Sequence, residues 1–353
     1  MSKWLHTRLN ELIDDASPDG VNPESGEDLA AWQSAARAAV EVVCGTRFVA
    51  AIDSPVSVLI REPMPAGLEA SPGRGILVGE LVRNLAEPGR ITQGRKGTCA
   101  PTVVETYLAV VAPGEYARII AALATSGRVT LRGGHELVRD GDGPLEWSED
   151  EGRRSPASRL FQVAALEAAS ATLDYDDTQD RQIGPDGEVA GGGMKADAFD
   201  VLIEAATGAT WERWSATEYG FAKILAAAGF AKPLELSAVL DAADSAIAAG
   251  DYGFATLAPS HVEQAALQAA MGGHLPDAAG DGAELHAVAH KVRIVRVEAD
   301  RVWFDDPLDP EAEWMGKGAV VEDASGLCSM PRAAFSECAA DISLRAQYWP
   351  GTD

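Results

Sequence analysis

The segment QGRKGTC, residues 93–99, carries the clearest signal for chemistry in the chain. Cys99 stands at the start of a predicted helix, where the helix dipole and free backbone N–H groups lower a thiol pKa and favour the nucleophilic thiolate. Attack on an amide forms an oxyanion that needs two hydrogen-bond donors. The Cys99 N–H can supply one, and Gln93 can supply the other across a loop that Gly97 allows to approach closely. The pattern predicts a cysteine nucleophile.

A cysteine nucleophile needs a base, and one predicted strand carries two histidines. His286 and His290 point to the same face about 13 Å apart, so only one of them can meet Cys99. His286 begins the strand after a polar loop, near a sheet end where clefts form. His290 lies mid-strand, where packing or partial solvation is expected. We therefore predict His286 as the base.

The base needs an acceptor that orients its ring, and two aspartates close the next predicted strand. Asp305 and Asp306 precede a proline and point to opposite faces, so one of them is expected to be solvated. A residue before proline favours extended geometry, which gives Asp306 a defined face. The pattern itself leaves both carboxylates as candidates, beside the plain alternative of an acidic turn before proline.

The elements that must position these residues change character along the chain. Helical spacing prevails in the first part, including a clear amphipathic helix after Cys99, although the Pro- and Gly-rich residues 54–75 predict a long connection or irregular strands. From about residue 251 a period of two indicates strands. We predict an α+β protein with an N-terminal accessory region at 1–84, a helical lobe with Cys99 at 85–250, and a β-rich lobe with His286 and Asp306 at 251–353.

Composition restricts the partners and the compartment. The 29 basic and 54 acidic residues give a formal charge of −25, which repels phosphates and argues against nucleic acid and anionic membranes. The sequence predicts no secretory signal and no membrane span. Four cysteines lack the spacing of a disulfide framework or a zinc site, which favours a reducing compartment. A cytoplasmic protein with no required cofactor is expected, and export without a cleaved signal remains compatible with these features.

These motifs together resemble the papain superfamily of cysteine proteases, most closely the calpain-type catalytic core. QGRKGTC is similar to the motif with the catalytic cysteine, and HAVAH to the strand with the catalytic histidine. LFQVAALEAASATLDY with GGGMKADAFDVLIEAATGA, and DDPLDPEAEWMG, are similar to two calpain stretches, so the resemblance covers roughly residues 85–318. It implies two lobes with a cleft between them, places Asp306 at the orienting position, and suggests calcium binding without identifying ligands. Ala100 and Leu308 stand where the family usually has tryptophan.

The combined pattern predicts acyl transfer by Cys99, His286, Asp306 and Gln93, with peptide hydrolysis as the leading outcome and a protein or peptide as the substrate. The same triad could instead deamidate or transamidate glutamine side chains, because access of water or amine decides between these reactions. A non-catalytic interaction module of the same fold is a third reading. The sequence indicates no particular activating partner.

Overall fold

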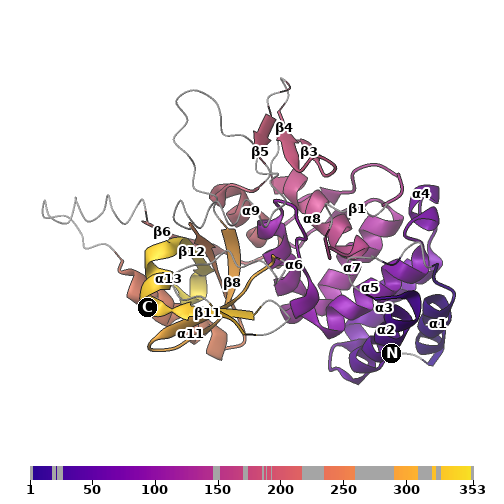
Figure 1. The fold of residues 1–353 in the computed structure, drawn as a ribbon, viewed down its shortest axis with the longest axis horizontal. Coiled ribbons are helices and arrows are strands. Elements are labelled where there is room, and N and C mark those ends of the chain that lie inside the picture. Colours follow the sequence, from indigo (N-terminus) through magenta and orange to yellow (C-terminus); the bar gives the residue numbers. More distant parts are fainter. Residues whose placement is uncertain are drawn as a thin grey trace, which may run out of the picture.

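The protein is described from a computed structural model that covers residues 3–17, 21, 27–145, 152–169, 174–184, 187, 189–191, 193–216, 234–258, 290–308, 320–322 and 327–350. A group of helices and an antiparallel sheet lie side by side, and helix α6 (Cys99–Val111) runs between them (Figure 1). The α+β class with antiparallel strands that the sequence predicts is confirmed. Every helix among the described residues is too short or too polar to cross a membrane.

The helical part is built around one apolar core that extends from Leu5 to Phe254. Two small antiparallel sheets lie at its edge. One is the hairpin of β1 (Arg128–Thr130) and β2 (Glu136–Val138), and the other has the three strands β3 (Asp174–Asp176), β4 (Arg181–Ile183) and β5 (Val189–Gly191). Residues before 85 share this core with the Cys99 helix, so no core boundary falls at residue 84. The remaining helical elements are α1 (Lys3–Asp14), α2 (Leu29–Gly45), α3 (Val49–Arg61), α4 (Ala66–Ala70), α5 (Arg74–Ala86), η3 (Pro88–Arg90), α7 (Pro113–Thr125), α8 (Pro156–Ala169) and α9 (Ala196–Thr207).

The expectation of irregular structure at residues 54–75 is wrong. Helix α3 continues through Pro55 to Arg61, and α4 and α5 follow after short connections. Proline removes one backbone donor from a helix, but four apolar side chains at helical spacing bury one face of α3. Burial of that face outweighs the local signal of proline. These side chains are Ile52, Val56, Leu59 and Ile60.

The sheet has seven strands in the order β10-β11-β9-β8-β7-β12-β6, with β8 (His290–Val297) at its centre. Strand β6 and helix α11 belong to this second part, although the sequence placed both in the helical lobe. A second apolar core unites the sheet with α11. The other elements are β6 (Trp211–Ser215), α11 (Leu236–Ala248), β7 (Gly253–Leu257), β9 (Arg301–Asp305), β10 (Val320–Val321), β11 (Leu327–Pro331), α13 (Arg332–Cys338), β12 (Ala339–Arg345) and η5 (Ala346–Tyr348).

Helix α6 is buried around most of its circumference because both parts of the molecule pack against it. It contacts α7, α8 and α9 on the helical side and β8 on the sheet side. Near the centre of α6 the Tyr107 hydroxyl donates a hydrogen bond to Asp251 at 2.9 Å and accepts one from Arg345 at 2.6 Å. Both partners come from the sheet side. A helix that is apolar on all faces is expected in such a buried position. The N-terminus of α6, with Cys99, consequently lies at the junction of the two parts.

Candidate active site

The loop before Cys99 is fastened to the segment that follows β9. Pro307 O accepts two hydrogen bonds, from Gln93 N at 2.8 Å and from the Thr92 hydroxyl at 2.8 Å. An isolated parallel bridge pairs Gly94 with Leu308. Residues more than two hundred positions apart therefore lie side by side. This contact brings the end of β9, and with it Asp306, to the N-terminus of α6.

The Cys99 thiol lies against His290 at the start of α6. The side chain is partly exposed, whereas the adjoining Thr98 and Ala100 are buried. Burial raises the pKa of Cys99, but a hydrogen bond and Coulomb attraction to His290, with backbone hydrogen bonds at Lys291 and Ala100, lower it below its ordinary value overall. The surroundings therefore favour a thiolate, the reactive form of cysteine.

His290 bridges the cysteine and an aspartate. Its Nε2 lies 2.7 Å from Asp306 Oδ1, and the two side chains are only 3% and 6% exposed. Asp306 Oδ1 also accepts from Leu308 N at 2.9 Å, which fixes the carboxylate. With Nε2 on Asp306, Nδ1 is the ring nitrogen left for Cys99. Burial lowers the pKa of His290, but Asp306 and then Cys99 raise it to about 10, so the imidazolium is favoured beside the thiolate.

The position of the histidine differs from the sequence-based prediction. His286 lies outside the described residues, and the structure brings His290 to Cys99 and Asp306 instead. The sequence predicts His290 to be packed or partly solvated in mid-strand, but it is buried in contact with both Cys99 and Asp306. In a strand, residues four apart face the same side, so alternation in the sequence could not decide between the two histidines. The register of β8 with β9 would have done so.

The two adjacent aspartates have different partners. Asp305 forms an ion pair with Arg293, with Arg293 Nε 2.9 Å from Asp305 Oδ2, and these two residues are also partners in the β8–β9 register. Asp306, one residue later, reaches His290. The opposite orientation of neighbouring strand residues thus separates a cross-strand ion pair from the contact with His290.

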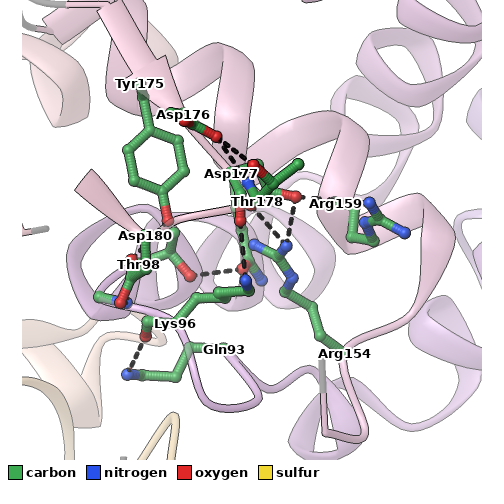
Figure 2. Close-up of polar contacts among 12 residues, drawn as sticks. Gln93, Lys96, Thr98, Arg154, Arg159, Tyr175, Asp176, Asp177, Thr178 and Asp180 are labelled. Carbon is green, nitrogen blue, oxygen red and sulfur yellow. Dashed lines mark hydrogen bonds and ion pairs between the residues drawn. The ribbon is translucent and has the colours of Figure 1, made fainter. Parts of the chain in front are cut away.

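Gln93 is buried in the loop rather than open to solvent. Its Nε2 donates to Lys96 O at 2.6 Å, and its Oε1 has no hydrogen-bond partner among the described residues (Figure 2). An amide nitrogen carries two hydrogens, so the bond to Lys96 occupies one and leaves the other. The side chain that the sequence predicts as an oxyanion donor is therefore held by the loop's own backbone.

A second glutamine, which sequence reasoning did not identify, connects both ends of the loop. Gln162 on α8 accepts a hydrogen bond from the Thr98 hydroxyl through its Oε1 at 2.8 Å. Its Nε2 donates to Thr92 O at 3.1 Å. It also donates to Glu105 Oε2 at 2.9 Å, on α6. The available signal was a single polar residue within the apolar run LFQVAAL, because a fully buried amide requires such partners.

Glu105 beneath the site makes stability depend on pH. Burial raises its pKa to about 7, although Tyr116, Gln162 and Ser158 donate to it and oppose the shift. Between its ordinary value of 4.5 and about 7 the folded chain binds more protons than the unfolded chain, so stability falls as pH rises. Glu105→Gln should flatten the slope of Tm against pH in this window, as measured by calorimetry. The exposed Glu62→Gln should keep the wild-type slope, and an unchanged slope in Glu105→Gln would contradict the assignment.

Among the described residues, no group of three or more His, Cys, Asp or Glu side chains could hold a metal ion. Comparison with protein-family models, curated proteins and solved structures finds no match to this chain.

Proposed function

We propose that this protein is a cysteine peptidase of papain-like, two-lobed architecture, in which Cys99 is the nucleophile, His290 the base and Asp306 the orienting acceptor. One observation carries the proposal. His290 contacts the Cys99 thiol and Asp306 together, although these residues come from distant parts of the chain. A nucleophile, a base and an acceptor in this order form the arrangement that acyl transfer requires.

The proposed reaction proceeds in two steps. Cys99 Sγ attacks the carbonyl carbon of a peptide bond. The resulting oxyanion accepts hydrogen bonds from the Cys99 backbone N–H and from the Gln93 amide hydrogen that is not bonded to Lys96 O. His290 gives its proton to the leaving amine, which departs as the new amino terminus. Water then attacks the thioester while His290 takes a proton from it, and the acyl product leaves as a carboxylic acid. Asp306 stabilises the charged ring throughout.

The electrostatics of the pair support this assignment. The pKa of Cys99 is lowered and that of His290 is raised, so a thiolate beside an imidazolium is favoured. Cys44 offers a contrast within the same chain, because burial and then the nearby Glu41 charge raise its pKa. A thiol-directed reagent at pH 6.5 should therefore select Cys99 over Cys44.

The test is labelling of the full chain with a peptidyl epoxide, followed by intact mass and peptide mapping. We expect one adduct, on Cys99, and none in Cys99→Ala. The same chain is then incubated with a denatured protein substrate, and new α-amino groups and ammonia are quantified. New α-amino groups support peptide hydrolysis. Ammonia without new α-amino groups would replace the peptidase with a deamidase, and labelling at Cys44 instead of Cys99 would contradict the site.

The adjacent aspartates provide a prediction with an internal control. Asp306→Ala should lower kcat strongly, roughly 10²-fold or more, because His290 loses the acceptor that fixes its tautomer and orientation. Asp306→Asn should be milder, since an amide oxygen can still accept from the ring. Asp305→Ala removes the ion pair with Arg293 and should leave kcat near the wild-type value. A larger loss from Asp305→Ala than from Asp306→Ala would refute the order of the triad.

A further inference from the structure

The turn between β3 and β4 supports the loop that carries Gln93 and Cys99. Lys96 Nζ, almost fully buried, donates to the carbonyl of Asp177 at 2.7 Å. The Asp177 carboxylate is held by the buried Arg154 at 2.6 and 2.7 Å. Figure 2 shows these side chains gathered between the hairpin and the loop. A segment about eighty residues later in the chain is thus part of the wall behind the proposed site.

Asp180 makes the most direct contact with the loop. Its two carboxylate oxygens lie 2.8 and 2.9 Å from Gly97 N, and Tyr175 donates its hydroxyl to Oδ1 at 2.6 Å. Asp180 is buried and has a φ of 48°, in the left-handed region that aspartate and asparagine enter more readily than most residues. The turn holds a backbone conformation that aims this carboxylate at Gly97.

Gly97 N–H and Lys96 C=O belong to one planar peptide unit. Asp180 binds the N–H side of this unit, and the Gln93 amide donates to its C=O side at 2.6 Å. A carboxylate on the N–H polarises the peptide and strengthens its carbonyl as an acceptor. Since Gln93 Oε1 has no partner among the described residues, the bond to Lys96 O is the main hydrogen bond that sets the orientation of the amide.

We propose that Asp180 is a positioning residue for the oxyanion donor: it fixes the peptide unit between Lys96 and Gly97, against which the Gln93 amide is oriented. This inference rests on the proposed cysteine chemistry and adds to it a residue that binds the Gly97 N–H of the loop and not the Cys99 thiol. Asp180 acts only through Gln93, so it affects steps that form an oxyanion and spares those that do not.

Two small probes separate these steps without knowledge of the natural substrate. Iodoacetamide alkylates Cys99 by direct displacement of iodide and forms no oxyanion. p-Nitrophenyl acetate acylates the thiol through a tetrahedral oxyanion and releases p-nitrophenolate. Rates are measured on the full chain, with the Cys99→Ala background subtracted. A wild-type Cys99 that reacts with both probes no faster than Cys44 would overturn the proposed function itself, before any Asp180 variant is made.

The variants are Asp180→Gly, which accepts the positive φ but removes the carboxylate, and Asp180→Asn, which keeps an acceptor. Asp180→Gly should slow acylation roughly tenfold or more, a part of the loss typical of a missing oxyanion donor, with alkylation nearly unchanged. Asp180→Asn should restore most of the acylation rate. Thr178→Ala, which removes a bond to Asp176 within the same turn, should leave both rates near wild type.

A double variant tests whether Asp180 acts through Gln93. Gln93→Ala should slow acylation by roughly 10²-fold or more, and Asp180→Gly added to it should cause no further loss. Multiplied losses in the double variant would overturn the proposal. Equal slowing of alkylation and acylation by Asp180→Gly would overturn it too, because that result describes general damage to the site. The proposal would also be overturned if Thr178→Ala slowed acylation as much as Asp180→Gly does.

Discussion

Replacement of His290 with alanine should lower kcat by roughly 10²- to 10⁴-fold, the usual contribution of general acid–base catalysis. The same change should raise the pKa of Cys99, because a hydrogen bond and Coulomb attraction to His290 lower it in the wild type. The pH profile of iodoacetamide alkylation should therefore move towards that of an ordinary thiol, near pH 8.5. Measurement of kcat with peptide substrate and of alkylation from pH 5 to 10 tests both effects.

The matched control is His286→Ala, which changes the histidine four residues earlier in the sequence. It should retain most of kcat and the wild-type alkylation profile. In the wild type, alkylation should begin below the usual thiol range, and hydrolysis should decline again as His290 loses its proton near pH 10. A profile unchanged in His290→Ala but shifted in His286→Ala would assign the base to the earlier histidine and contradict the proposed site.

Cys99→Ala should abolish hydrolysis, a loss of roughly 10⁴-fold or more, because no other group in the proposed site can form the thioester. The fold should persist, since the change removes one partly exposed sulfur atom at a helix terminus. Circular dichroism and thermal unfolding check the fold, and product release measured over a long incubation checks the activity.

Cys44→Ala is the control for the nucleophile, because Cys44 is also partly exposed but lies on α2, apart from His290. It should keep wild-type kcat, as should Cys328→Ala and Cys338→Ala if their removal from the second core is tolerated. Turnover by Cys99→Ala above that of a boiled sample would exclude Cys99 as the nucleophile.

The fold was predictable where periodicity is strong. Apolar spacing after Cys99 indicated α6, and alternation after residue 251 indicated an antiparallel sheet, since burial of one face dictates both patterns. The pattern missed α3, where Pro55 suggested a break that the packing of Ile52 and Val56 overrides. It also misplaced the division between the parts, because a strand such as β6 gives no local sign of the sheet that it joins.

The site was predictable in its residue types more than in its geometry. Spacing alone singled out Cys99 and Gln93, but the choice between His286 and His290 depended on register and on a contact between Pro307 and the loop before α6. Such contacts between distant segments leave little local trace. The support from Asp180 and Gln162 was missed for the same reason, since each is one polar residue in an ordinary helix or turn.

The docking of Pro307 and Leu308 onto the loop before α6 also bears on the synthesis of the protein. During translation the Cys99 helix leaves the ribosome long before β8 and β9 do, and domains fold as their residues emerge. Until the later strands are in place, the thiol lacks both the His290 ring and the Lys291 backbone contact that lower its pKa. A nascent or truncated chain therefore carries Cys99 without these two contacts. Under the proposed function, the thiol gains its full reactivity only when β8 and β9 have folded against α6, which would spare the proteins around a partly made copy.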